Sequence, residues 1–313
     1  MRLYKLSPAV KDYIWGGTNL KKEWNKVSDA DRVAETWELS FHPDGPSRIA
    51  AGPEEGRLLR EVVSREEYGT NCQKFPFFPT LVKFIDAADN LSVQVHPSDE
   101  YALSEEGQFG KTEMWYVCGR EPGAGIYCGF EREISPEEYA ARIAEGRLTE
   151  VLKLFAVEPG ECYFIPAGTV HAIGKGTTIC EIQQNSNLTY RVYDFGRVGK
   201  DGKPRELHVE KAERVSVLAP YVPAGGARKI SERIRLLASC PYFTVYEVKT
   251  LEEDGFDTDA SSFTSFSVIE GSGEAGTGGS FLPFRKGDTF FATAGEGRVS
   301  LRGRATLLLT RVE

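Results

Sequence analysis

Short apolar runs interrupted by turn residues recur along almost the whole chain, and they constrain its fold more than any other feature. Each run is rich in β-branched and aromatic residues and is bounded by Gly, Pro, Asn or Asp. The runs include FFPTLVKFIDA, LSVQVHP, EMWYVCG, AGIYCGF, CYFIPAG, TICEIQQ and LTYRVYDFG. Segments of this kind at regular spacing are typical of antiparallel strands in a sandwich or barrel. The sequence therefore predicts a mainly β protein.

Helical signals are few and local. The segment SPEEYAARIAEG places Ser135 at an N-cap, Pro136 at the first helical position and Glu138 where it completes a capping box. The following LTEVLKLFAV continues the helical spacing of apolar residues, so we expect a helical insertion between strands over about residues 135–157. A second helix is expected near residue 60, in EEGRLLREVVSREEYG.

A change of composition near residue 220 indicates two domains. The stretch from Pro220 to Gly226 is rich in Pro and Gly, as linkers are, and the segments beyond it again have strand character. We therefore expect one domain over residues 1–219 and a smaller all-β domain over residues 220–313. A chain of 313 residues can bury a large core as two domains, or as one domain with a sizeable extension.

Charge and cysteine content restrict the partners and the compartment. The formal net charge of −8 argues against a nucleic-acid or anionic-membrane partner, although a small anionic ligand could still meet a local group of cations. No apolar run approaches the roughly 20 residues of a membrane span, and the first residues lack the apolar core of a secretion signal. The six cysteines form no CxxC pair and are expected to be reduced. Together these features predict a cytoplasmic protein.

The segment GECYFIPAGTVHAIG holds one of only four histidines in the chain. Its spacing of Gly160, Pro166, Gly168 and His171 resembles the second conserved motif of the cupin superfamily. The motif describes a strand, a tight Pro/Gly turn and a return strand, which would direct the histidine into the mouth of a jelly-roll barrel. The fold expected for the first domain is therefore a cupin jelly-roll β-sandwich.

Residues on neighbouring predicted strands could share a metal ion with His171. Gln94 and His96 alternate onto one face of SVQVHP, and Glu113 begins the next apolar strand in GKTEMWYV. Two neutral imidazoles and a carboxylate bind divalent metals and leave room for water or substrate. Iron(II) would accept the same three ligands. The sequence predicts a metal site of His96, Glu113 and His171, with Gln94 beside it.

Longer motifs carry a narrower resemblance. The segments LSVQVHPSDE, GKTEMWYV, GECYFIPAGTVHAIGKG and EIQQNSNLTYRVYDFGR, with YIWGGTNL and AETWELSFHPDG, are similar to type I mannose-6-phosphate isomerases in their short bacterial form. The resemblance covers nearly the whole chain. It implies a zinc-dependent cupin enzyme of mannose metabolism, with one zinc ion per chain, that interconverts mannose 6-phosphate and fructose 6-phosphate. One departure is Ile173, where longer members have a tyrosine, so any role of that tyrosine is absent or supplied elsewhere.

The resemblance also implies roles for individual residues. The zinc ligands of the family fall on the three metal residues named above, with the neighbouring glutamine as a further ligand in the longer members. The active-site arginine falls on Arg191 and an active-site carboxylate on Glu181. Family positions near the phosphate or the sugar fall on Lys83, Ser92 and Lys111. The implied partner is a small sugar phosphate, and both a monomer and a homodimer remain open.

Aldose–ketose isomerisation moves a proton between C2 and C1 through an enediol, and the sequence offers a group for each task. Zinc would stabilise the charge that develops on O1 and O2, and Arg191 suits either the enediolate or the phosphate. Lys83, Lys111 and Ser92 would form a cationic pocket in which phosphate binding positions the reacting carbons. Glu181 is the first candidate for the base, and a zinc-bound water or Lys111 is the alternative.

A second copy of the Gly-rich motif occurs near the C-terminus, in GDTFFATAGEGR. Thr293 stands where the first copy has its proline, and Arg298 stands where it has its histidine. No histidine follows His208, so the second domain is expected to be a degenerate cupin without metal ligands and with a structural role. A Gly-rich hairpin of unrelated origin would give a similar pattern.

Two other functions would use the same metal ligands. An iron(II) cupin oxygenase would need the metal and oxygen but no cationic pocket. A non-catalytic cupin would bind a sugar phosphate as a signal without turning it over. The presence of Lys83, Lys111 and Arg191 together with the metal ligands favours the isomerase over both.

Overall fold

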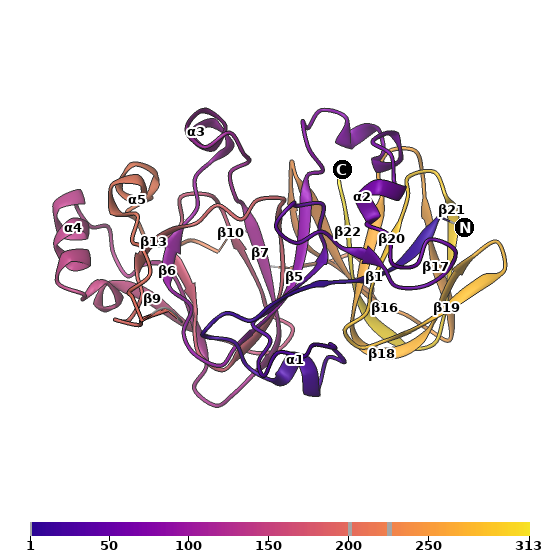
Figure 1. Cartoon of the computed structure of the whole chain (residues 1–313), viewed down its shortest axis with the longest axis horizontal. Coiled ribbons are helices and arrows are strands. Elements are labelled where there is room, and N and C mark those ends of the chain that lie inside the picture. Colours follow the sequence, from indigo (N-terminus) through magenta and orange to yellow (C-terminus); the bar gives the residue numbers. More distant parts are fainter. Residues whose placement is uncertain (1, 200–201, 224–226) are drawn as a thin grey trace.

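Three sheets make up the computed structural model, which describes residues 2–199, 202–223 and 227–313. Two of them, on the left of Figure 1, face each other as a sandwich, and the third forms most of the right half. The mainly β fold expected from the sequence is confirmed. None of the helices in the described ranges has the length and apolar character of a membrane span.

The sandwich consists of a six-stranded and a five-stranded antiparallel sheet. In spatial order, the six-stranded sheet contains β10 (Cys162–Ile165), β7 (Glu113–Arg120), β12 (Thr177–Gln184), β5 (Thr80–Ala87), β3 (Glu35–Leu39) and β2 (Ala9–Lys11). The five-stranded sheet contains β13 (Tyr190–Tyr193), β6 (Val93–Val95), β11 (His171–Ile173), β8 (Gly125–Phe130) and β9 (Leu152–Ala156).

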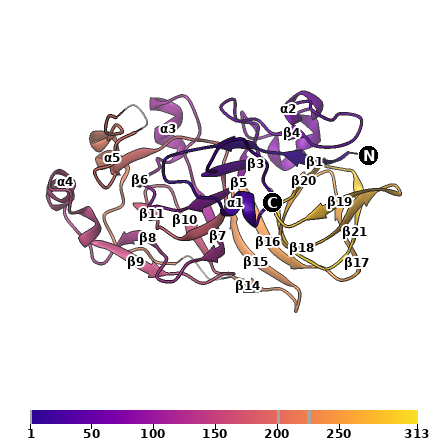
Figure 2. The same cartoon turned by 60° about the horizontal axis from the view of Figure 1, so that its bottom comes forward.

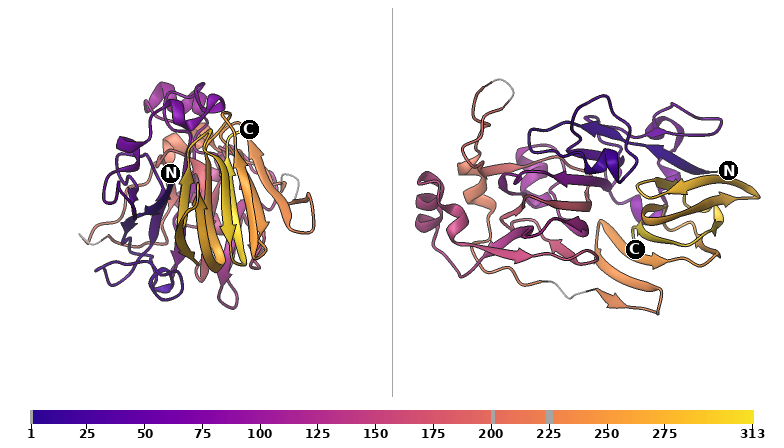
Figure 3. Two further views of the ribbon diagram at one scale, coloured as in Figure 1. Left: turned by 90° about the vertical axis from the view of Figure 1, so that its right-hand side faces the viewer. Right: turned by 90° about the horizontal axis from the view of Figure 1, so that it is seen from below.

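The third sheet combines both ends of the chain. Its main path runs through β14 (Arg228–Lys229), β15 (Ile234–Cys240), β16 (Phe243–Lys249), β22 (Ala305–Arg311), β18 (Thr264–Thr277), β20 (Thr289–Ala292), β1 (Leu3–Ser7) and β4 (Arg48–Ile49). Three further strands pair off this path: β17 (Glu253–Thr258), β19 (Ser280–Arg285) and β21 (Gly297–Arg302). Figure 2 shows β1 beside β20, and the left view of Figure 3 shows the strands of this sheet face-on.

The helices are short and lie outside the sheets. They are α1 (Asn19–Lys22), α2 (Leu59–Val62), η1 (Glu66–Tyr68), η2 (Thr70–Cys72), α3 (Asp99–Glu105), α4 (Pro136–Ala144), η3 (Leu148–Glu150) and α5 (Val209–Val215). Ser135 caps α4 as expected, because its hydroxyl accepts a hydrogen bond from the Glu138 N–H at 3.2 Å. Near residue 60 the predicted helix is reduced to α2 and the turn of η1.

The predicted helical insertion over residues 135–157 is wrong in its second half. The α-helix ends at Ala144, and residues 152–156 form strand β9 at the edge of the five-stranded sheet. Leu154 of this strand lies opposite Tyr127 of β8. Apolar residues at alternate positions in LKLFA fit a strand as well as a helix, and pairing with β8 decides between them.

The six-stranded sheet is buried on both faces, which explains its long apolar runs. Every residue of β5 and β12 is buried. On one side, Ile85 and Ile179 pack with residues of the five-stranded sheet. On the other side, Phe84 and Ile182 pack with residues of the third sheet. Charged side chains on these strands are therefore costly to bury and need partners.

Strand pairing crosses the boundary expected near residue 220. Strand β1, from the first residues of the chain, pairs with β20, so the third sheet is not made by residues 220–313 alone. The division into residues 1–219 and 220–313 stays a prediction. In the second Gly-rich motif, β20 and β21 flank the turn, as β10 and β11 flank the turn of the first. Arg298 forms an ion pair with Asp257 at the surface.

Candidate metal and substrate site

Strand register places two rows of functional side chains opposite each other inside the sandwich. In the five-stranded sheet, Gln94 lies opposite both His171 and Arg191, so these three residues form one row across β11, β6 and β13. Laterally paired residues point to the same face of a sheet. A shift of one residue in β6 would turn its functional side chains away from the site.

The facing row belongs to the six-stranded sheet. Glu181 of β12 lies opposite Trp115 on one side and Lys83 on the other, and Lys83 lies opposite Trp37. The row therefore runs from β7 through β12 and β5 to β3. Glu113 lies two residues before Trp115 on β7 and faces the same way.

The three residues expected to bind a metal lie together. Ligand atoms of His96, Glu113 and His171 are all within 4.8 Å of one another, and each residue is at most 1% exposed. The Nε2 atom of His171 is 3.3 Å from Oε1 of Glu113, and Nε2 of His96 is 3.6 Å from Oε2 of the same carboxylate. Gln94 lies beside this group, with its Nε2 3.5 Å from Nε2 of His171.

Backbone carbonyls fix both imidazoles in the form that binds metals. The Nδ1–H of His96 donates to the carbonyl of Leu188 at 2.8 Å, and that of His171 donates to the carbonyl of Thr169 at 2.8 Å. A carbonyl oxygen only accepts, so each Nε2 carries the lone pair that faces the group. Burial, together with the Lys111 charge, lowers the pKa of His171 to about 4. The same causes place the pKa of His96 well below its ordinary value.

The group is built to surround a cation. Oε1 of Glu113 is buried and has no hydrogen-bond partner, so a charged acceptor is left open toward the two imidazoles. Burial, with repulsion from Glu181, raises the pKa of Glu113 to about 7. The ammonium of Lys111 forms an ion pair with Glu113 and lies 3.1 Å from Nε2 of His96. A divalent metal would stabilise the ionised carboxylate, and two imidazoles with one carboxylate suit zinc.

Two carboxylates flank Lys83 in matching environments. Glu181 accepts a hydrogen bond from Nε1 of Trp115 at 2.9 Å, and its Oε1 is 3.5 Å from Nζ of Lys83. Glu35 accepts from Nε1 of Trp37 at 2.7 Å and lies 3.4 Å from the same ammonium. The two carboxylates differ in one contact. Oε1 of Glu181 is also 3.5 Å from Nζ of Lys111, the lysine that forms an ion pair with Glu113.

Glu181 is held in the ionised form. Burial alone would raise its pKa, but the ammonium groups of Lys111 and Lys83 outweigh burial and place the pKa below its ordinary value. Its Oε2 is occupied by Trp115, whereas its buried Oε1 has no hydrogen-bond partner. The carboxylate therefore offers the interior of the site one oxygen that accepts no hydrogen bond and is approached by two ammonium groups.

A cavity of about 310 Å³ joins these groups. Its lining includes every expected site residue outside the metal group: Lys83, Ser92, Gln94, Lys111, Glu181 and Arg191. The three metal residues do not line the cavity. Lys111 and Gln94 line it, and both also contact residues of the metal group. All residues expected from the sequence are thus brought to one place.

Other residues of the lining were not anticipated. They are Tyr13, Trp15, Glu35, Trp37, Ile85, Leu91, Asn187, Thr189 and Arg205. The first four lie in the motifs YIWGG and AETWELS, which signalled family resemblance but no role. Arg205 lies in the cation-rich stretch GRVGKDGKPREL, whose composition was the one available signal.

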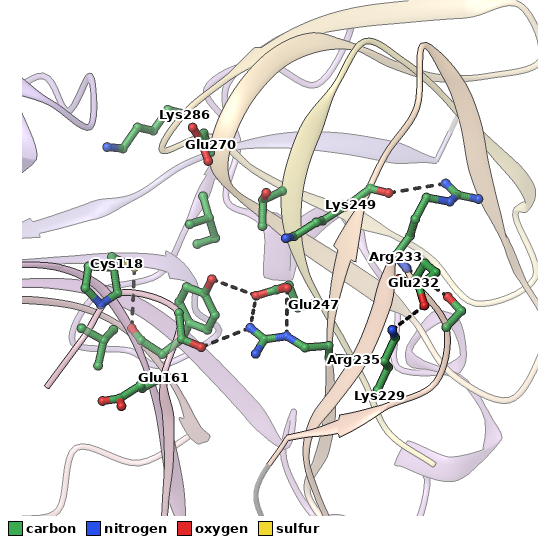
Figure 4. Close-up of a pocket in the computed structure, with 17 residues that line it drawn as sticks. Cys118, Glu161, Lys229, Glu232, Arg233, Arg235, Glu247, Lys249, Glu270 and Lys286 are labelled. Atoms are coloured by element: carbon green, nitrogen blue, oxygen red, sulfur yellow. Dashed lines mark hydrogen bonds and ion pairs between the residues drawn. The ribbon is translucent and has the colours of Figure 1, made fainter.

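A larger cavity, of about 780 Å³, lies elsewhere, between the six-stranded sheet and the third sheet (Figure 4). Two ion pairs join charged side chains of its lining, Glu247 with Arg235 and Lys229 with Glu232, and Glu247 also accepts a hydrogen bond from the Tyr116 hydroxyl at 2.9 Å. None of the expected site residues lines it. The smaller cavity beside the metal group is the candidate site.

The sandwich and its buried His-Glu-His group define a cupin-type protein with a candidate metal site. A model of the type I phosphomannose isomerase catalytic domain matches residues 3–115, and one of the mannose-6-phosphate isomerase cupin domain matches residues 233–312. Mannose-6-phosphate isomerase ManA of Bacillus subtilis is 36% identical over 97% of this chain and 97% of its own. The chain therefore belongs to the type I mannose-6-phosphate isomerase family.

Solved structures agree with this assignment. The crystal structure of a Bacillus subtilis mannose 6-phosphate isomerase superposes with a TM-score of 0.90 at 34% identity and covers 99% of both chains. A mannose 6-phosphate isomerase with zinc bound superposes with a TM-score of 0.81 over the whole of both chains. At 18% identity, this second likeness shows the fold alone.

Proposed function

We propose that this isomerase interconverts mannose 6-phosphate and fructose 6-phosphate, with zinc held by His96, Glu113 and His171. One observation carries the proposal: a buried group suited to a divalent metal lies directly beside a cavity lined by several cations and by a carboxylate with an oxygen that accepts no hydrogen bond. Family membership supports the substrate. The buried set of two imidazoles and one carboxylate supports zinc.

When bound, zinc supplies a Lewis acid that stabilises negative charge on the substrate oxygens next to C1 and C2. The residues of the chain orient the substrate around that position. The buried ammonium groups of Lys83 and Lys111 would donate hydrogen bonds to the substrate, and both groups lie within 3.5 Å of Glu181. Gln94 lies between the metal group and Arg191 in the row across the five-stranded sheet, and it borders the same cavity.

Glu181 is proposed as the base. Its ionised carboxylate takes the proton from C2 of the aldose at Oε1 and returns it to C1, while a proton moves from O2 to O1. The hydrogen bond from Trp115 to Oε2 directs the other oxygen into the site. Lys111 is the alternative base, but in this arrangement its ammonium balances the charges of Glu113 and Glu181.

The proposal extends to the compartment, the metal content and the partner of the protein. We propose a cytoplasmic enzyme of carbohydrate metabolism that uses one zinc ion per chain and has a sugar phosphate, not nucleic acid or a membrane, as its partner. The net charge of −8 supports this choice of partners. A monomer and a homodimer are both compatible with a site whose named residues all belong to one chain, and size-exclusion chromatography with light scattering distinguishes them.

The proposal is tested by following mannose 6-phosphate with purified, zinc-loaded protein. Fructose 6-phosphate should appear until the equilibrium ratio is reached, without oxygen consumption. His171→Ala should lose both metal and turnover, because one of three ligands is removed. Zinc-loaded protein that binds metal tightly yet forms no fructose 6-phosphate would show that the proposed reaction is wrong, and oxygen uptake with iron would then indicate an oxygenase.

A further inference from the structure

The end of the cavity farthest along the row from His171 contains a second guanidinium. Arg191 and Arg205 both line the cavity, and they come from different segments: Arg191 from β13, and Arg205 from the loop that follows it. The sequence predicted Arg191 as a site residue but gave no such prediction for Arg205. Two guanidiniums at one end of a cavity in a protein of net charge −8 need an explanation.

The guanidinium of Arg191 donates to uncharged acceptors. Its Nε donates to the Ser92 hydroxyl at 3.2 Å, and its Nη1 donates to the carbonyl of Glu206 at 3.0 Å. Neither acceptor is charged, and Arg191 has no ion pair with a carboxylate among the residues that the structure describes. Burial and the nearby charge of Arg205 lower its pKa, and the charges of Asp194 and Glu206 offset this only in part.

Arg205 is held in place from behind. Its Nε donates to Oδ2 of Asp194 at 2.7 Å, and its Nη2 donates to the other oxygen of the same carboxylate. The side chain of Asp194 is only 6% exposed, so this contact is a fixed, two-point attachment. The carboxylate also accepts a hydrogen bond from Arg197 at 2.6 Å, so one negative charge is shared between two guanidiniums.

The loop that carries Arg205 is anchored to the strand that carries Arg191. The N–H of His208 donates to the carbonyl of Arg191 at 2.7 Å, and the two arms of the loop meet where Val198 pairs with Pro204. The positions of the two arginines are therefore coupled through the backbone. This arrangement presents two guanidiniums and the Ser92 hydroxyl before any ligand arrives.

We propose that Arg205, oriented by Asp194, is a second phosphate-binding guanidinium beside Arg191 and determines specificity for phosphorylated over neutral hexoses. The inference rests on the proposed function and names the phosphate end of that same site. The row from His171 through Gln94 to Arg191 spans two strand spacings, about 10 Å, which places the two arginines beyond the reacting carbons. A phosphate monoester carries nearly two negative charges at pH 7 and matches this pair.

The test compares Arg205→Ala with wild type, using mannose 6-phosphate as substrate and inorganic phosphate as inhibitor. Loss of one charge-assisted contact should raise KM and the phosphate inhibition constant about 10- to 100-fold. The value of kcat should stay within about threefold, since the chemistry lies at the other end of the cavity. Arg205→Lys keeps the charge but not the fork, so it should recover part of the affinity.

Arg197→Ala is the matched control. Arg197 binds the same Asp194 carboxylate but does not line the cavity, and it also contacts the backbone carbonyl of Asn90. It should leave KM and phosphate inhibition within about threefold of wild type. If Arg205→Ala leaves both constants unchanged, or lowers kcat alone, Arg205 does not bind phosphate.

Calorimetry separates this inference from the proposed reaction. Binding of inorganic phosphate and of mannose 6-phosphate is measured for wild type and for Arg205→Ala, with thermal unfolding as the check on folding. Weaker binding by Arg205→Ala supports the phosphate role even if wild type fails to isomerise the sugar. Equal binding by the two proteins overturns it even if wild type is an active isomerase.

Discussion

Replacing Glu181 by glutamine tests the assignment of the base with little change in shape. The amide oxygen can still accept the hydrogen bond that Trp115 donates at 2.9 Å. What is lost is a negative charge 3.5 Å from the ammonium groups of Lys83 and Lys111, and with it the ability to take a proton. The substitution therefore separates proton transfer from packing.

The size of the effect follows from these contacts. Removing a general base costs about 100- to 10,000-fold in kcat, or about 3 to 5 kcal/mol of barrier. The stability loss should be smaller than the 3 to 5 kcal/mol typical of a broken buried ion pair. Lys83 keeps Glu35 at 3.4 Å, and Lys111 keeps Glu113, so neither lysine is left without a carboxylate. We expect a loss of about 1 to 2 kcal/mol, which lowers Tm by a few degrees.

The chain supplies a matched control in Glu35→Gln. Glu35 also accepts from an indole N–H and also pairs with Lys83, but it has no contact with Lys111. Both variants are assayed for formation of fructose 6-phosphate and for exchange of the C2 proton with deuterated water. Glu181→Gln should lose both reactions, whereas Glu35→Gln should lose less than about tenfold. Proton exchange at the wild-type rate in Glu181→Gln would refute the assignment and favour Lys111.

Two further predictions concern stability. Burial opposes ionisation of Asp194, but hydrogen bonds from Arg205 and Arg197 outweigh burial and hold the pKa of Asp194 below its ordinary value. A depressed carboxyl pKa contributes stability that is present above about pH 4 and is lost as pH falls below it. Asp194→Asn should therefore be less stable than wild type at pH 7, and the difference should shrink between pH 5 and pH 3 in urea titrations; a constant difference would contradict this. Glu247→Gln weakens the partly buried ion pair with Arg235 in the larger cavity and should cost about 1 kcal/mol of unfolding free energy. Its KM should be unchanged, and a changed KM would show that the two cavities are coupled.

The metal group could be predicted from sequence because its geometry is encoded locally. A Pro/Gly turn fixes where His171 begins its return strand, and alternation along β6 places Gln94 and His96 on one face. Glu113 begins the next apolar strand, and strand register then brings the four residues together. Burial on both faces also made the strands of the six-stranded sheet recognisable as continuous apolar runs.

The features that the sequence did not predict depend on long-range contacts, which leave no local signal in the sequence. Strand β1 pairs with β20, nearly the whole chain length away, and nothing near Leu3 specifies that partner. The segment Leu152–Ala156 fits either a helix or a strand, and its neighbour in space decides. Arg205 comes from an irregular loop, so no periodic pattern could place it in the cavity. Glu35 lay in a motif of the family but had no role until its distance to Lys83 was known.

A zinc titration of the metal-free protein tests the central claim most directly. Chelated protein is supplied with increasing zinc, and the initial rate of fructose 6-phosphate formation is measured at each addition. We predict no activity without metal, a linear rise, and a sharp break at one zinc ion per chain, because one buried group within residues 2–199, 202–223 and 227–313 offers the ligands. Full activity in the metal-free protein, or a rate that does not respond to zinc, would contradict the account.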